Sequence, residues 1–318
     1  MYESKMNSFM DELTDRLLSE LGEGYAIDKT TVIKNNGVVY HGLVVKKEQC
    51  NVAPTIYVDS LYTDFLNERS INDIVQEIIA AYKMHNNKIN IAQINSKDWL
   101  IYENIFQDIF IKVVNFKNNE QMLKQHPHIR FLDLAITFHI FVEAIDGVQG
   151  SIRVNNDLMD RWNISVEELY NTARINTRRL YPFKVRHIKE VVRDMLDGEY
   201  YENNYEYSMT NDEKCDIVEC DEAKPDMYVL TNEIGVNGSA ALIYDDYLAE
   251  LSRKHGDRLV LLPSSIHELI CITGTDETDY SYLKALVREV NLTQVAPEEI
   301  LSDNIYIYDN TTRCVECY

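Results

Sequence analysis

Proline and glycine are scarce in this chain, and long apolar runs are missing. Its 318 residues include only 6 Pro and 11 Gly, too few for a collagen-like or low-complexity protein. Even the most apolar stretch, residues 131–142, is interrupted by Asp133, Thr137 and His139, so no segment is long enough for a membrane-spanning helix. The first residues, MYESKMNSFMDEL, carry charges where a signal peptide needs an apolar core. We therefore expect a cytoplasmic location.

Basic residues are also in deficit. The chain has 31 Lys and Arg against 52 Asp and Glu, a formal net charge of −21. A field of this sign repels phosphate backbones and anionic lipid surfaces, which argues against nucleic acid or a membrane as the partner. The excess is uneven, because residues 199–318 carry 25 acidic and 8 basic side chains, a net charge of −17. The C-terminal part is thus the strongly acidic one.

Residues 199–226 are the densest acidic segment. They hold 10 acids, 2 lysines and no Leu or Phe, so they cannot bury enough apolar surface to offset the entropy of ordering. We predict an acidic linker or mobile loop between an N-terminal α+β domain (1–198) and a C-terminal α+β domain (227–318). The alternative is an arm that docks on a basic surface through its tyrosines, which are Tyr200, Tyr201, Tyr205 and Tyr207.

Helical and β-prone patterns follow one another without a regular βαβ alternation. This order predicts an α+β fold of two lobes, with mixed or antiparallel sheets and flanking helices. An amphipathic helix should end at Gly22, and a hairpin should turn at residues 35–37, Asn-Asn-Gly. Ser165 with Glu168 forms a capping-box signature for a helix over 166–179. Strands are predicted at, among other places, residues 131–142 and 240–244.

Two loops in the C-terminal part could hold a ligand. The first is a turn with Gly238 and Ser239, and the second, in residues 263–268, contains Ser264, Ser265 and His267. The first loop lacks the flanking elements of a P-loop or a nucleophile elbow, and the Ser, His and Glu of the second are neighbours in sequence, whereas real triads meet from separate segments. The simpler interpretation is two turns whose serines bond to backbone groups. If a ligand pocket exists, we expect these two loops to face it from adjacent strand ends.

A basic stretch precedes the acidic segment and includes Arg174, Arg178 and Arg179. Arg174 and Arg178 are four residues apart and so share a helix face. Two interpretations remain open. The arginines either pair internally with the acidic C-terminal half or contact an anion at the candidate pocket.

Cysteine and histidine spacings give weak metal signals. Cys314 and Cys317 have the spacing of a zinc knuckle, and Cys215 with Cys220 could complete four thiolates, but this second pair is loosely spaced. Acidic neighbours raise thiol pKa values, which argues against a redox pair. The motif His126-Pro-His128 is more typical of a surface turn. We therefore predict no bound metal and no cofactor.

Three segments, residues 155–179, 228–272 and 287–308, together with the opening hairpin, resemble the domain of unknown function family 5688 of Gram-positive anaerobic bacteria. A more distant likeness to family 1444 lies in the helix after Ser165 and in the strand ending at Pro263-Ser264. The resemblance implies a cytoplasmic bacterial protein and carries no catalytic residue, substrate or cofactor.

These observations favour an acidic interaction or regulatory module that binds a protein partner with a basic surface. One alternative is an enzyme or small-ligand binder with its site at the 235–239 and 263–268 loops. A third possibility is a DNA mimic that occupies a nucleic-acid-binding protein.

Overall fold

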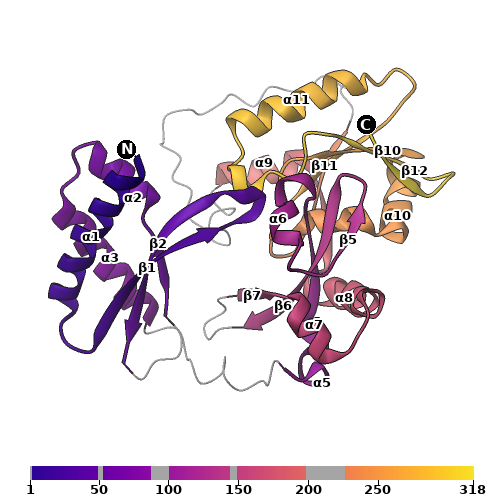
Figure 1. Ribbon diagram of the computed structural model, residues 1–318. Coiled ribbons are helices and arrows are strands. Elements are labelled where there is room, and N and C mark those ends of the chain that lie inside the picture. The colour runs from indigo at the N-terminus through magenta and orange to yellow at the C-terminus, as the bar shows by residue number, and fades with distance from the viewer. Residues whose placement is uncertain (1, 49–52, 87–99, 144–148, 198–225) are drawn as a thin grey trace. The chain divides into compact units, whose positions relative to one another are not determined.

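The computed structural model describes residues 2–48, 53–86, 100–143, 149–197 and 226–318. Within these ranges the chain forms helices and three antiparallel sheets (Figure 1). It divides into two compact units, Met1–Ile105 with Phe141–Ile152, and Phe106–Ile140 with Arg153–Tyr318. The predicted α+β class, with antiparallel sheets and flanking helices, is confirmed. No helix in the described ranges is long and apolar enough to cross a membrane.

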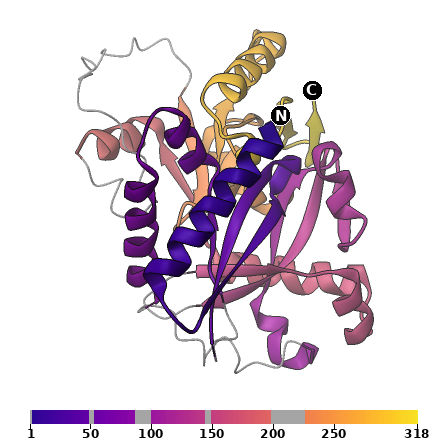
Figure 2. The same cartoon turned by 60° about the vertical axis from the view of Figure 1, so that its left-hand side comes forward.

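The first unit is built on a sheet of order β1-β2-β3. Its elements are α1 (Tyr2–Leu21), β1 (Tyr25–Ile33), β2 (Val39–Lys47), β3 (Thr55–Tyr57), α2 (Asp59–Leu66) and α3 (Ile71–Asn86). In Figure 2, α1 runs along β1 and β2, and its apolar face, including Met6 and Leu13, forms one core with Leu43. The predicted Asn-Gly turn is confirmed, because Asn36 and Gly37 supply positive φ angles of 59° and 72°.

The second sheet has β6 (Leu134–Glu143) at its centre. It pairs with β4 (Ile109–Asn115), and also with β5 (His128–Phe131) and β7 (Gln149–Arg153). The strand predicted over 131–142 is confirmed from Leu134 on as β6, but its first three residues are wrong, because the chain turns at Leu132-Asp133 and makes β5 and β6 a hairpin. Leu132 has a φ of 56°, which an apolar side chain seldom signals in sequence.

Helices border this sheet. They are α6 (Glu120–Leu123), α7 (Asn156–Trp162) and α8 (Val166–Leu180), while the short helix α5 (Tyr102–Ile105) belongs to the first unit. The predicted capping box starts α8, because the Ser165 hydroxyl accepts from the Glu168 N–H at 3.2 Å and Glu168 accepts the Ser165 N–H at 2.8 Å. Thr177 of α8 accepts the N–H of Ile111 at 2.9 Å, so α8 lies along the outer edge of β4.

The third sheet has six strands in the order β13-β12-β10-β11-β9-β8. They are β8 (Phe183–His187), β9 (Met227–Asn232), β10 (Arg258–Pro263), β11 (Leu269–Thr273), β12 (Tyr306–Asp309) and β13 (Cys314–Cys317). The accompanying helices are α9 (Ile188–Asp197), α10 (Asp245–His255) and α11 (Tyr280–Thr293). The core beneath α11 contains Val260, Ile272 and Val287.

The strand predicted at 240–244 is also wrong. Residues Gly238–Ile243 form a buried 3-10 helix that leads into α10. The preceding turn therefore joins β9 to a helix and not to a second strand. A short apolar run such as Ala-Ala-Leu-Ile fits a strand or a helix by pattern alone. Here the run is helical, and all of its residues are buried.

The predicted linker at 199–226 lies, except for Asp226, outside the described residues. The strands on either side of it, β8 and β9, pair in one antiparallel ladder with Val185 opposite Leu230. The predicted separation of 1–198 from 227–318 stays a prediction.

Candidate functional site

The two candidate loops meet, as their positions at strand ends suggested. The Gly238 N–H donates to the His267 carbonyl at 2.9 Å, and the Ser239 hydroxyl donates to the Ile266 carbonyl at 2.6 Å. The Asn237 N–H donates to Nδ1 of the His267 ring at 3.2 Å. Backbone and side-chain bonds therefore join the two loops directly.

Gly238 shows how close this contact is. A Cβ at this position would lie 2.5 Å from the Thr231 hydroxyl and 2.6 Å from the His267 carbonyl oxygen. Ser239 is fully buried. Glycine is thus required by the approach of the two backbones, and the Ser239 hydroxyl is occupied in an interior bond.

The remaining loop residues also bond locally. The Ser265 hydroxyl accepts the N–H of His267 at 2.9 Å, and Ser264 donates to Glu268 at 3.5 Å. Nε2 of His267 lies 3.5 Å from a Glu299 carboxylate oxygen, and His267 lowers the pKa of Glu299. No serine hydroxyl of these loops contacts the His267 ring, so the geometry of a nucleophile activated by a base is not formed.

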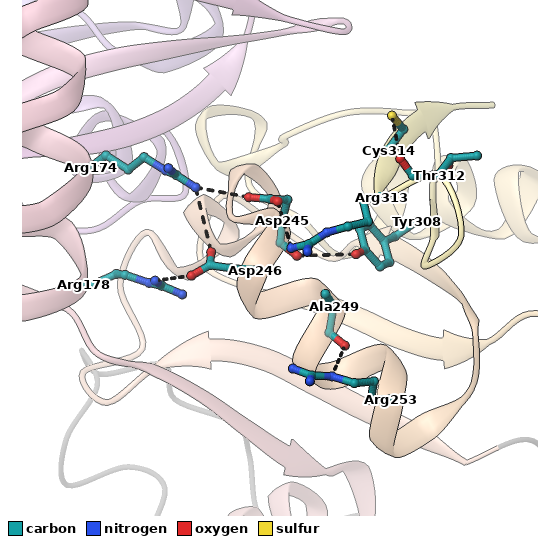
Figure 3. Close-up of polar contacts among 10 residues, drawn as sticks. All are labelled: Arg174, Arg178, Asp245, Asp246, Ala249, Arg253, Tyr308, Thr312, Arg313 and Cys314. Carbon is teal, nitrogen blue, oxygen red and sulfur yellow. Dashed lines mark hydrogen bonds and ion pairs between the residues drawn. The ribbon is translucent and has the colours of Figure 1, made fainter.

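The arginines of α8 contact the start of α10 (Figure 3). Arg174 reaches Asp245 at 3.3 Å and Asp246 at 3.8 Å, and Arg178 reaches Asp246 at 2.5 Å. Arg313, from the turn before β13, contacts Asp245 at 3.1 Å from the other side. Arg174 and Arg178 therefore pair internally with acids, which is the first of the two interpretations of this basic stretch.

Tyr244 supports this ion-pair cluster. Its ring lies 5.2 Å and 5.0 Å from the guanidinium carbons of Arg174 and Arg178, within the range of cation–π attraction. Its hydroxyl donates to the Arg174 carbonyl at 2.8 Å, and burial raises its pKa to about 12. A groove of about 550 Å³ lies beside this cluster. The residues that line it are Asn171, Arg174, Ile175, Arg178, Tyr244, Asp245 and Asp246. Two cations and two carboxylates face it, so it has no net preference for an anion.

Arg179, the third predicted anion contact, donates to the Gln107 carbonyl instead. The hydrogen bonds of Arg174, Arg178 and Arg179 thus go to α10 and to Gln107, and not to the candidate loops. An anion role for these residues at the loops stays a prediction without a contact that supports it.

Sequence reasoning missed a polar junction at Asp133. Its Oδ2 accepts from the Ser302 hydroxyl at 2.6 Å and from the Asn304 amide at 2.9 Å. Its Oδ1 accepts from the Tyr306 hydroxyl at 2.9 Å, and the Cys317 thiol lies 3.6 Å away. The only available signal was an acid inside an apolar run. Asp133 ties the β5–β6 turn to the chain around β12.

The cysteines and histidines that their spacing singled out make separate contacts and do not come together as one group within the described residues. Burial raises the pKa of Cys271 to about 12, and burial followed by the nearby Asp133 raises that of Cys317 to about 11, so neither is a ready thiolate. Cys215 and Cys220 lie outside the described residues. Nδ1 of His126 contacts the Met122 carbonyl, at 2.7 Å, and Nδ1 of His128 contacts the His126 carbonyl, at 2.9 Å. The described ranges contain no group of three or more metal-binding side chains.

Comparison with known proteins places the chain by family alone. No curated protein and no solved structure matches it. One family model matches residues 6–310, which is nearly the whole chain and includes the segments that carried the resemblance. The chain therefore belongs to the Family of unknown function (DUF5688).

Proposed function

We propose that this DUF5688 protein is an acidic interaction or regulatory module of the bacterial cytoplasm, which binds a protein partner with a basic surface. The observation that carries the proposal is the surplus of acid in the C-terminal part. Residues 226–318 hold 16 acidic and 6 basic side chains, and residues 199–225 add 9 acids and 2 lysines. Opposite charge on a partner would speed association and select against acidic competitors.

Internal pairing does not remove this surplus. Arg313 and Arg258 contact aspartates of the same part of the chain, and Lys254 contacts Glu250. Each contact engages an acid as well as a base, so the net charge of residues 226–318 stays −10. The serine hydroxyls of the candidate loops are already hydrogen-bonded within the loops, to a carbonyl, a backbone N–H and a carboxylate, which weakens a catalytic function at that site.

The experiment is to isolate partners from a native bacterial lysate with the full chain as bait and then measure association kinetics with the purified partner. We expect the association rate to fall as salt rises, with little change in the dissociation rate, because exposed charges are screened beyond roughly 8 Å at physiological ionic strength. Glu219→Gln with Asp221→Asn and Glu222→Gln should slow association at low salt.

The matched control neutralises three exposed acids of the first unit, Asp15→Asn, Glu20→Gln and Glu23→Gln. Its association rate should stay near the wild-type value. A partner whose association rate ignores both salt and the acidic substitutions would contradict the proposal. If the partner is a nucleic-acid-binding protein, and duplex DNA competes with this chain for binding to it, the chain acts as a DNA mimic.

The second candidate is an enzyme or small-ligand binder. The specific observation in its favour is that residues 235–239 and 263–268 are joined by direct hydrogen bonds. It predicts that Ser265→Ala or Ser239→Ala abolishes ligand binding while the acidic substitutions are silent.

A further inference from the structure

Basic side chains gather on one face of the β4–β6 ladder, away from the sites described above. Lys112 of β4 lies opposite Thr137 of β6, and Phe110 lies opposite His139. Because side chains alternate along a strand, these four residues share one face of the sheet. His139 is buried, and its ring lies 5.7 Å from that of Phe110.

A short hydrogen-bond chain orders this face. The Thr137 hydroxyl donates to the Lys112 carbonyl at 3.1 Å. Its single proton is used there, so the 3.1 Å contact with His139 is a bond in which Nε2 of the ring donates to the hydroxyl. Nε2 of His139 therefore carries a proton, and because burial lowers the pKa of His139 well below its usual value, the ring is neutral with its single proton there.

Arg153, the last residue of β7, joins the same group. The next residue, Val154, donates its N–H to the Phe138 carbonyl at 2.9 Å, which brings the end of β7 beside His139. Nε of Arg153 is buried and has no hydrogen-bond partner. A buried donor without an acceptor is rare and unfavourable in proteins.

The pKa values of this group are shifted downward. Burial is the largest cause that lowers the pKa values of Lys112, to about 8, of His126 and of His139, and the charge of Arg153 lowers all three further. Burial alone shifts the pKa of Arg153, downward, and no acidic side chain of the described ranges opposes it. Arg153 is half-buried, and a charge in such a position is costly unless it is paired or hydrogen-bonded, so a bound anion would stabilise it.

We propose that Arg153, with Lys112 and His126 beside it, binds a doubly charged oxyanion, the phosphate group of a small molecule or phosphate itself. The guanidinium offers paired N–H donors that match two oxygens of a phosphate. Several neighbouring basic groups favour a dianion over a single carboxylate. His139 is a positioning residue, since its ring bonds to Thr137 and not to the ligand.

The first test measures the melting temperature of the full chain at pH 7 in sodium phosphate, sodium acetate or sodium chloride of matched ionic strength. Phosphate should raise the melting temperature with saturation, and acetate should raise it less. Glycerol 2-phosphate forms a further arm, in which tighter binding than that of inorganic phosphate indicates a phosphorylated small molecule, and equal or weaker binding indicates phosphate itself. A response to acetate as large as that to phosphate overturns the proposal.

Arg153→Gln should weaken phosphate binding by about tenfold or more, because it removes a charge-assisted hydrogen bond. The matched control is Arg161→Gln, which neutralises an exposed arginine of α7 and should leave phosphate affinity unchanged. Wild-type affinity in folded Arg153→Gln overturns the proposal.

A second measurement uses the wild-type protein and does not depend on whether a variant folds. Proton NMR follows the ring titrations of His126 and His255, with His255 of α10 as the internal control. A bound dianion should raise the pKa of His126 and leave that of His255 unchanged. Equal movement of both histidines, or of neither, overturns the proposal.

Discussion

Arg174 and Arg178 of α8 each contact an aspartate of α10, whereas the charge of Arg153 of β7 acts on the basic residues Lys112 and His126. The first two are partly exposed, their charges are balanced, and a tyrosine ring lies beneath them. Arg153 shares with Arg174 a buried Nε that has no hydrogen-bond partner, but no acid of the described ranges balances its charge. The difference teaches that a cluster of cations is a candidate anion site only where the fold has not already supplied the anion.

Asp133 completes the comparison as an acid without a base. It is held by the hydroxyls of Ser302 and Tyr306 and by the amide of Asn304. These charged groups are stabilised by opposite charge at Arg174 and Arg178, by neutral donors at Asp133, and by no acid of the described ranges at Arg153. Substitutions at Asp133, Asp246 and Arg153, and at Lys112 in the basic group around Arg153, test this comparison.

The largest effect is expected at Asp133. Asp133→Ala would leave three partly buried donors without an acceptor, which lowers the free energy of unfolding by roughly 3 kcal/mol. Urea unfolding measures this loss, and Asp160→Ala, at an exposed position of α7, is the control with little expected change. A loss at Asp133 no larger than that at Asp160 would show that the junction is dispensable.

The second effect is a pH dependence at Lys112. Its pKa in the folded protein is about 8, below the usual 10.5, so the charged lysine destabilises the fold. This penalty is complete below pH 8 and fades as the pH rises toward 10.5, because the unfolded chain then loses the same proton. The stability of Lys112→Met relative to wild type should therefore fall by about 2 kcal/mol between pH 7 and pH 10. A pH-independent difference would mean that Lys112 is not in the basic group described here.

The smallest effect is expected in the balanced cluster. Asp246→Asn removes one carboxylate from two exposed ion pairs, which lowers the free energy of unfolding by about 0.5–1 kcal/mol. The loss should shrink in 1 M salt, where exposed pairs are screened. If the loss of unfolding free energy does not depend on salt, its cause is a change at the start of α10 and not the loss of the ion pairs with Arg174 and Arg178.

Local signals explain which parts of the fold were predictable. The Asn-Gly turn and the Ser165–Glu168 capping box are decided by residues close in sequence, and both are present. The strands β8 and β13 are short and lie at the two edges of the third sheet, and periodicity over four or five residues does not distinguish them from loops. The turn at Leu132-Asp133 was hidden because a leucine there adopts a positive φ.

The candidate loops were predictable as neighbours because they follow or precede strands of one sheet. Their hydrogen bonds were not, since the partner of the Ser239 hydroxyl is a carbonyl 27 positions away. The basic group around Arg153 left no sequence signal at all. Its members, Lys112, His126, His139 and Arg153, are separated by 13 or more positions, and three of them come together through the pairing of β4, β6 and β7.

The most direct measurement compares Arg153→Met with Arg178→Met by urea unfolding at pH 7 in phosphate-free buffer. Arg153→Met removes a half-buried cation that no acid of the described ranges balances, and we expect it to raise the free energy of unfolding by about 1 kcal/mol. Arg178→Met breaks an exposed ion pair and should lower it by about 0.5 kcal/mol. Opposite signs for the two variants support the account. A loss of stability in Arg153→Met as large as that in Arg178→Met, or larger, would contradict it.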